Sequence, residues 1–167
     1  PPRMFVRKVR SWDKAGTEDG GAWSVGVLMG LHADGSFWIL DVVRGQWGST
    51  RREETIRMTA ELDGESVEIL LEIEGGSGGK ESGENTVRRL AGFPVVTYHP
   101  TGDKEARAYP FSSQVGGGNV SVVKANWTKD FLEELRYFPH SKYKDQVDAA
   151  SAAFTRLARK KKKVGGW

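Results

Sequence analysis

The chain has 167 residues, which suits a single domain built on one core. Hydrophobic residues make up 38% of it and charged residues 28%, and no apolar run approaches the roughly 18 residues that span a bilayer. We therefore expect no membrane partner. The absence of cysteine excludes disulfides, thiolate catalysis and cysteine-ligated zinc. Because no signal peptide opens the sequence, we expect an intracellular protein.

Basic residues cluster at both ends of the chain, although the net charge is only +3. Residues 159–163 read Arg-Lys-Lys-Lys-Lys, and four more basic residues lie near the start: Arg3, Arg7, Lys8 and Arg10. Such clusters favour a polyanionic partner, while a solvated tail is the alternative for the lysine run. We divide the chain into a domain over 1–158 and a basic tail over 159–167.

Three strand-like segments open the chain, over residues 4–12, 22–31 and 36–44. The turn signal Ala-Asp-Gly at 33–35 separates the second from the third, and the three segments together predict a meander. A helix is expected next over 51–62, with Ser49 or Thr50 as its N-cap.

The middle of the chain predicts a strand, a helix and a second strand. The apolar run 67–73 is typical of a strand buried on both faces, and 93–98 is another short strand. Between them we expect a glycine-rich loop over 75–79 and a helix over 80–90. This order implies a parallel pair joined by a right-handed crossover.

Four more elements complete the expected order. A helix over 104–115 and a short strand over 120–123 precede a helix over 129–138, for which Thr128 is the expected N-cap. From residue 144 onward apolar residues repeat at helical spacing, so a final helix carries two aspartates in its first turn.

Four acidic residues lie at the ends of these elements: Asp13, Glu72, Asp145 and Asp148. Asp13 ends a strand, where a turn-forming role is the alternative. Glu72 closes an apolar run, and a carboxylate buried there needs a metal or a basic partner. Glu74 could face inward instead, because alternate residues of a strand share a face. The two helical aspartates could simply favour the helix N-terminus. Together the four predict a magnesium site that cleaves phosphodiesters.

The glycine-rich segment follows the strand-end carboxylate directly. It lacks the phosphate-loop pattern, because Glu74 stands where the first glycine belongs and Glu81 follows Lys80. Glycines permit close approach of another backbone, so we expect 75–79 to admit a nucleic-acid strand beside the site, with Lys80 as a DNA contact.

Several segments, in this order, resemble the nuclease domain of the large terminase subunit of tailed bacteriophages. They are residues 13–15 (DKA), 37–45 (FWILDVVRG), 72–80 (EIEGGSGGK), 102–110 (GDKEARAYP), Trp127, 131–135 (FLEEL), 138–139 (FP) and 145–149 (DQVDA). The resemblance covers nearly the whole chain. It implies an α/β fold similar to ribonuclease H and the RuvC resolvases, with a mixed central sheet, an antiparallel meander plus parallel strands, flanked by helices.

The resemblance also implies an activity and its residues. Such domains cleave concatemeric viral double-stranded DNA during genome packaging, by two-metal-ion hydrolysis with Mg²⁺ or Mn²⁺. By residue matching, Asp13 and Glu72 are the first two catalytic metal ligands, and Asp13 is the natural bridge between two ions. The family shows two adjacent aspartates before Gln-Val-Asp-Ala, whereas Lys144 takes the first place here. That leaves Asp145 as the preferred third ligand and Asp148 as an alternative metal ligand.

The same resemblance implies the partners. DNA contacts are expected from six basic residues: Lys80, Lys104, Arg107, Lys144, Lys160 and Lys161. A surface helix with local ion pairs is the alternative for 104–107. In a full-length protein the partners are a packaging ATPase domain, the small terminase subunit and the portal protein, in the host cell cytoplasm.

Two other functions remain open at this stage. The first is another enzyme of the same fold, either a RuvC-like junction resolvase or a ribonuclease H. The second is a non-catalytic nucleic-acid-binding module whose acids are structural and whose lysine tail binds the polyanion. Dependence on divalent metal separates the second from the enzymes, because simple binding weakens smoothly with salt and needs no Mg²⁺.

Overall fold

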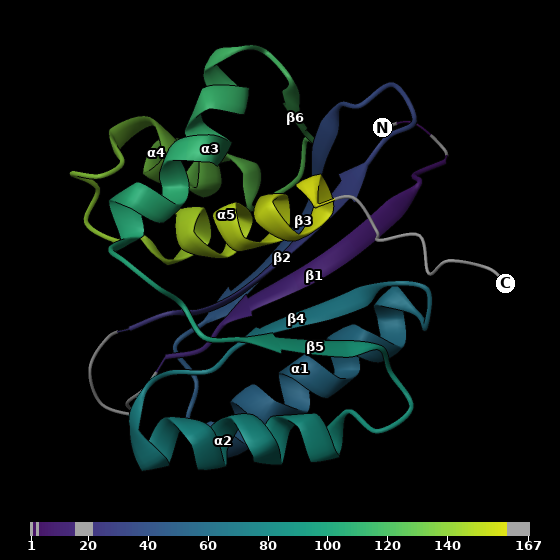
Figure 1. Cartoon of the computed structure of the whole chain (residues 1–167), viewed down its shortest axis with the longest axis vertical. Coiled ribbons are helices and arrows are strands. Elements are labelled where there is room, and N and C mark those ends of the chain that lie inside the picture. The colour runs from purple at the N-terminus through teal and green to yellow at the C-terminus, as the bar shows by residue number, and fades with distance from the viewer. Residues whose placement is uncertain (1, 3, 16–21, 160–167) are drawn as a thin grey trace, which may run out of the picture.

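The computed structural model describes residues 2, 4–15 and 22–159. Its centre is a six-stranded mixed sheet in the order β5-β4-β1-β2-β3-β6 (Figure 1). The strands are β1 (Arg7–Asp13), β2 (Ser24–Leu31), β3 (Phe37–Gly45), β4 (Glu68–Glu72), β5 (Val95–Tyr98) and β6 (Val120–Val122). Strands β1, β2 and β3 form the antiparallel meander, while β4 runs parallel to both β1 and β5. The predicted meander, crossover pair and α/β class are confirmed.

Within the described residues, five helices cover the two faces of the sheet. They are α1 (Ser49–Asp63), α2 (Gly76–Arg89), α3 (Lys104–Gly116), α4 (Thr128–Tyr137) and α5 (Asp145–Ala158). Figure 1 shows α1 and α2 on one side of the sheet, and α3, α4 and α5 on the other. None of the helices in the described part of the chain is both long and apolar enough to cross a membrane.

Strand alternation decides which side chains face α5. In β1, Val9 packs into the core beneath α3, α4 and α5, whereas Trp12 packs into the smaller core beneath α1 and α2. In β4, Leu70 belongs to the first core and Leu71 to the second. Because alternate residues share a face, the strand-end residue Asp13 lies on the α5 side with Val9. By the same count Glu72 lies on that side with Leu70.

Arg10 shows that part of the N-terminal basic cluster has a structural role. Its side chain is 2% exposed and faces the opposite side from Asp13. The guanidinium donates hydrogen bonds to both carboxylate oxygens of Asp63 at 2.7 and 2.8 Å and to Asp41 Oδ2 at 2.8 Å. It therefore fastens the end of α1 to the sheet, and the expectation that it contacts a polyanion is wrong, because a buried, paired guanidinium is not accessible to phosphates.

Three local predictions are wrong. Residues 76–79 are the first turn of α2 rather than a loop, with Gly75 as N-cap. The N-cap of α1 is Gly48, not Ser49 or Thr50, which already lie within the helix. Thr128 does not cap α4, because its hydroxyl accepts a bond from the backbone N–H of Ala125 and donates one to the carbonyl of Val123, and Trp127 takes the N-cap place.

One glycine in the first turn of α2, Gly79, is required because the turn lies against the residues after β4. A Cβ at Gly79 would overlap the backbone carbonyl of Glu74, which cannot move cheaply, whereas a Cβ at Gly78 would meet nothing within 4 Å. Close approach of backbones is one use of glycine that other residues cannot replace. Sequence composition alone could not separate this use from a flexible loop.

We expect Gly78→Ala to raise the free energy of unfolding by about 0.5–1 kcal/mol, because alanine loses less conformational freedom on entering a helix. Gly79→Ala, one residue away, is expected to lower it by about 1–3 kcal/mol through overpacking. Urea denaturation of both variants tests this. Equal effects would show that α2 does not pack tightly on the residues after β4.

Candidate metal centre

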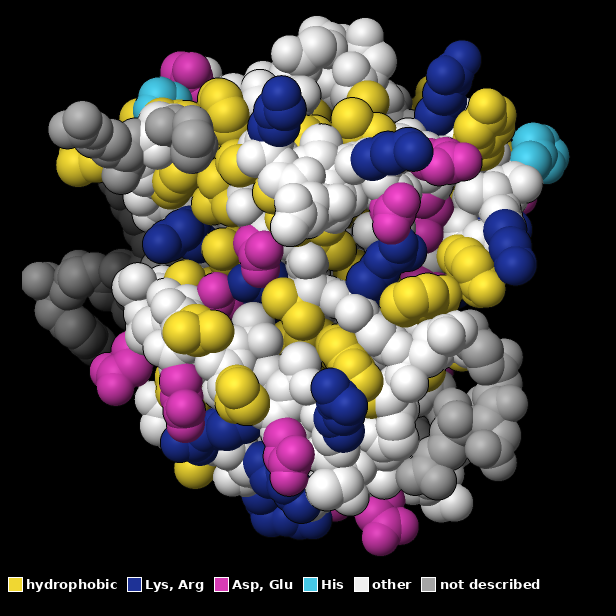
Figure 2. Space-filling view, turned by 180° about the vertical axis from the view of Figure 1, so that it is seen from behind, with side chains coloured by type: hydrophobic (Ala, Val, Ile, Leu, Met, Phe, Trp, Pro, Cys, Tyr) yellow, Lys and Arg dark blue, Asp and Glu magenta, His cyan; other side chains and the backbone are white. Residues whose placement is uncertain are grey.

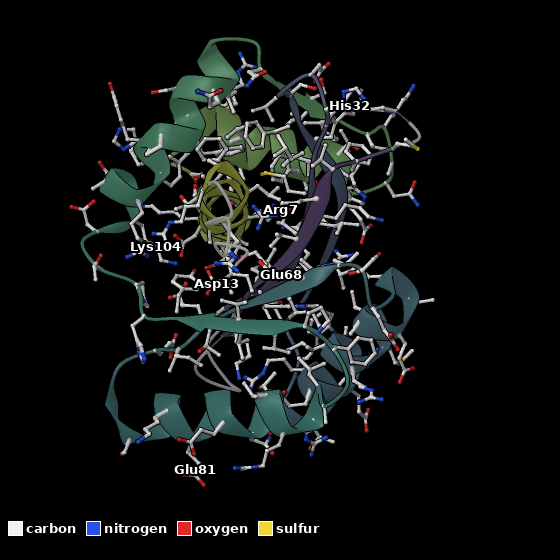
Figure 3. All side chains as sticks on the ribbon, turned by 45° about the vertical axis from the view of Figure 1, so that its right-hand side comes forward. Arg7, Asp13, His32, Glu68, Glu81 and Lys104 are labelled. Carbon is white, nitrogen blue, oxygen red and sulfur yellow. The ribbon has the colours of Figure 1, made fainter. Side chains whose placement is uncertain are left out.

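Three carboxylates meet where β1, β4 and α5 come together. Asp13, Glu72 and Asp148 each offer an oxygen, and these atoms all lie within 4.8 Å of one another. The pairing of Trp12 with Leu71 in the parallel register makes Asp13 and Glu72 the next residues along two adjacent strands. Asp148 approaches from the first turn of α5. Figure 3 shows Asp13 and Lys104 on the same side of the sheet, near the end of α5.

Two of the three carboxylates, those of Asp13 and Asp148, are buried and incompletely paired. Asp13 is 8% exposed and Asp148 is 5% exposed. Among the described residues, Oδ2 of each has no hydrogen-bond partner, although Lys104 Nζ lies 3.2 Å from Asp148 Oδ2 as an ion pair. A buried carboxylate oxygen without a hydrogen-bond partner is costly, and a hard divalent cation is the ligand that best fits two such oxygens beside a third carboxylate, that of Glu72.

Two cations from α3 balance part of this negative charge. Lys104 Nζ lies 3.6 Å from Asp13 Oδ2, 3.7 Å from Asp145 Oδ1 and 3.2 Å from Asp148 Oδ2. Arg107 adds an ion pair with Asp148 Oδ1 at 3.4 Å. Both residues were predicted to contact DNA, and in this structure their charged groups face the carboxylates.

Burial and mutual repulsion change the acidity of the cluster. Burial raises the pKa of Asp13 well above its ordinary value, and the neighbouring carboxylates add to this while Lys104 opposes it. Burial also raises the pKa of Glu72 and of Asp145. For Lys104 burial acts to lower the pKa, but the surrounding carboxylates outweigh it and raise the pKa. The cluster therefore favours any bound cation.

Tyr98 is a member of the site that the sequence did not reveal. Its hydroxyl, at the end of β5, donates a 3.0 Å hydrogen bond to Glu72 Oε2. In the parallel pairing of β4 with β5, Tyr98 lies opposite Glu72. The signal that could have found it is this register, because two parallel strands predicted as neighbours end at the same edge of the sheet.

Lys14 fixes the end of β1 on the opposite face. Its side chain is 9% exposed, and the ammonium donates 2.8 Å hydrogen bonds to the hydroxyls of Ser82 and Thr86, with Glu53 Oε1 at 3.4 Å. Burial lowers the pKa of Lys14, and the charge of Glu53 opposes that effect. The network joins β1 to α1 and α2 directly beside Asp13, so it holds that carboxylate in place.

Glu134 holds the start of α5. This buried side chain of α4 accepts a 2.7 Å hydrogen bond from the backbone N–H of Val147 and a 3.3 Å bond from Gln146 Nε2. The backbone N–H groups of a first helical turn lack partners within the helix, and a carboxylate also suits the positive end of the helix dipole. Glu134 therefore sets the position of the turn that carries Asp148.

The other predicted site residues lie at or beyond the edge of the group. Asp145 is outside the set of three carboxylates and reaches Lys104 from the rim. Lys144 precedes α5 as its N-cap. Lys80 and Glu74 are exposed. Lys160 and Lys161 lie outside the described residues.

Burial raises the pKa of Glu134 from 4.5 to about 7, against the opposing bonds from Val147 and Gln146. The folded protein then binds this proton more tightly than the unfolded chain, so the contribution of Glu134 to stability falls as pH rises from about 4.5 to about 7. We expect Glu134→Gln, which keeps an acceptor for the Val147 N–H, to flatten this fall. Urea unfolding at several pH values in chelator measures it, with exposed Glu133→Gln as control; an unchanged slope would contradict the assignment.

Structural comparisons find relatives in phages and other viruses. The large terminase nuclease of thermophilic phage G20c, solved with bound zinc, superposes with a TM-score of 0.68 at 15% identity over 90% of this chain and 81% of that one. Structures of that nuclease with bound magnesium and with bound cobalt give TM-scores of 0.67 and 0.68. The large terminase of a second thermophilic bacteriophage gives 0.64 at 14% identity, and the match covers 94% of this chain but only 42% of that longer protein.

Resolvases share the fold less closely. The fowlpox virus Holliday junction resolvase gives a TM-score of 0.54 at 11% identity, over 90% of this chain and 96% of that one. These identities support the ribonuclease H-like fold alone. No curated protein sequence matches significantly. Residues 10–157 match the family described as the terminase RNaseH-like domain, which confirms the resemblance read from the sequence. The chain therefore belongs to the terminase ribonuclease H-like domain family.

Proposed function

We propose that this chain is a metal-dependent endodeoxyribonuclease domain that cleaves concatemeric viral double-stranded DNA during genome packaging. The observation that carries the proposal is the group of three carboxylates, Asp13, Glu72 and Asp148, brought within 4.8 Å from three separate elements. Two of its buried oxygens have no hydrogen-bond partner among the described residues. The family match and the metals bound to the phage G20c nuclease support the same interpretation.

Each residue has a task in this proposal. Bound Mg²⁺ or Mn²⁺, with two ions in the active complex, would supply an activated water and stabilise the leaving oxygen. Asp13, Glu72 and Asp148 would hold metal, which makes Asp148 the preferred third ligand in place of Asp145. Asp145, on the rim, is then the candidate for completing a second position. Tyr98 orients Glu72 through its hydrogen bond.

DNA contacts complete the proposal. Lys80 is exposed on α2, and Lys144 precedes Asp145 at the start of α5, so both are accessible positions for phosphate contacts. Lys104 and Arg107 could reach a phosphate only by leaving their carboxylate partners. Figure 2 shows positive and negative side chains interspersed on the face seen from behind, without a single broad basic patch. The proposal also includes DNA contacts from Lys160 and Lys161 of the 159–167 tail. In a full-length protein the domain would act in the host cytoplasm with a packaging ATPase domain, the small terminase subunit and the portal protein.

A junction resolvase is the second candidate, because two Holliday junction resolvases share the fold at TM-scores of 0.54 and 0.55. A cleavage assay that compares linear duplexes, four-way junctions and RNA–DNA hybrids distinguishes the terminase, resolvase and ribonuclease H activities. A purely binding module would bind all of these without cleavage, whatever the metal. The proposal expects cleavage of linear duplex DNA and no preference for junctions or hybrids.

The ligand assignment predicts a graded set of variants in plasmid nicking with Mn²⁺. Asp13→Asn and Asp148→Asn should each lower the rate by more than about 100-fold, because even residues behind metal ligands cost about 10–100-fold. Asp145→Asn should retain part of the activity. Exposed Glu81→Gln, on the far side of α2 in Figure 3, is the control. If Asp145→Asn is inactive while Asp148→Asn is active, the third ligand is Asp145.

Lys104 competes with metal for the carboxylates, so its removal should favour metal. We expect Lys104→Met to tighten Mn²⁺ binding roughly tenfold by calorimetry, because one repelling charge within a few ångströms is lost. Its melting temperature in chelator should fall, since the acids lose their counter-charge. Exposed Lys129→Met provides the control. Weaker metal binding by Lys104→Met would show that the lysine supports the metal site instead.

A further inference from the structure

A cavity opens beside the first turn of α5, where Gln146 lies. It has a volume of about 350 Å³, within the range of small-ligand sites. The start of β2, the end of β3, α4 and the segment before α5 enclose it, and its aromatic lining comes from Trp23, Tyr137 and Tyr143. We call it the aromatic pocket, after these three residues. None of them has a role in the metal centre.

Two of the rings in the aromatic pocket, those of Trp23 and Tyr143, are held by contacts with their neighbours. Trp23 and Tyr143 meet edge to face, with centroids 6.1 Å apart and planes at 77°. The guanidinium of Arg44 lies 4.5 Å above the Trp23 ring and forms an ion pair with Asp130. Tyr137 is 54% exposed at the mouth. A flat aromatic ligand entering the cavity would thus find rigid faces to stack on, at little cost in side-chain ordering.

Polar atoms in the same wall lack partners. Among the described residues, the indole N–H of Trp23, Oγ of Ser141 and Oε1 of Gln146 are buried and form no hydrogen bond. The aromatic cavity thus contains one hydrogen-bond donor, one acceptor, and one hydroxyl that can donate or accept. Unpaired buried groups cost free energy, and a ligand whose edge carries both donors and acceptors would recover it after small rotations of these side chains.

We propose that the aromatic pocket binds the base of an unpaired nucleotide next to the scissile phosphate, an inference that rests on the proposed nuclease function. A nucleobase combines a flat π-face with a donor and acceptor edge, which are the two features of this lining. Gln146 in the lining directly follows Asp145 at the rim of the metal centre, so the two sites adjoin across the first turn of α5.

The charges of the lining favour a neutral occupant over a phosphate. Of its acidic side chains, Asp130 is paired with Arg44, burial raises the pKa of Glu134 to about 7, and Glu133 opposes an anion. The basic residues Lys142 and Arg44 also line it, and Lys142 lies 5.2 Å from the Tyr143 ring. A neutral base inside, with its phosphate near Lys142 or Lys144, satisfies both sets of charges. Bases stacked within a duplex cannot enter, so the pocket selects sequences that open easily near the cut.

Binding in chelator, where no cleavage occurs, tests the proposal. Fluorescence anisotropy compares a duplex carrying a short bulge of unpaired thymidines with the same duplex whose bulge is abasic. We expect the protein to bind the thymidine bulge about tenfold more tightly, as stacking on an aromatic side chain predicts. Tyr143→Leu should reduce this preference to about twofold or less. Tyr109→Leu, 74% exposed on α3, should keep it.

Equal affinity of the unsubstituted protein for the two bulges would overturn the proposal without reliance on any variant, and would leave a protein side chain as the better occupant. An unchanged preference in Tyr143→Leu, folded as judged by its melting curve, would also overturn it. Failure of the nuclease proposal gives a different result, because cleavage would be absent with Mn²⁺ while the preference for unpaired bases in chelator persisted.

Discussion

The structure depends on gathering like charges in a place with little water. Asp13 and Glu72 are neighbours because β1 and β4 are parallel and in register, and α5 closes over them with Asp148. Each carboxylate raises the free energy of ionising the others, and burial adds to that cost. Without a divalent ion, Lys104 supplies the compensating charge. A fold that accepts this local cost needs strong support around it.

That support comes from buried polar contacts, one for each element that carries an acid. Lys14 ties the end of β1 to α1 and α2, Tyr98 on β5 bonds Glu72, and Glu134 on α4 holds the first turn of α5. Lys14 and Glu134 restrict Asp13 and Asp148 through neighbouring residues, whereas Tyr98 bonds Oε2 of Glu72 directly. None of the three contacts uses Oδ2 of Asp13 or Oδ2 of Asp148, whose ion-pair partner is Lys104. Placing ligands on rigid, separately anchored elements is how a metal site keeps its geometry.

Much of this could be predicted from the sequence, and what could not depends on tertiary contacts. The alternation of apolar and polar residues located the strands of the meander. Glu72 was recognisable as a candidate ligand because a carboxylate ended an apolar run. The choice between Asp145 and Asp148 was not predictable, because the rotation of α5 is set by Glu134 from another helix. The glycines at 76–79 were taken for a loop because composition does not show that α2 begins against the carbonyl of Glu74.

The charge balance of the site suggests how Lys104 participates. Asp13, Glu72, Asp145 and Asp148 are four acids, and Lys104 with Arg107 provides two positive charges. With all six ionised, two net negative charges remain, which one divalent ion neutralises. A second ion would make the site positive unless a phosphate arrives with it, and Lys104 stands within 3.7 Å of the carboxylates that this ion needs. Under the two-ion mechanism proposed above, entry of DNA and of a second ion would therefore be coupled, because the phosphate would both neutralise the ion and give the displaced ammonium of Lys104 a new partner.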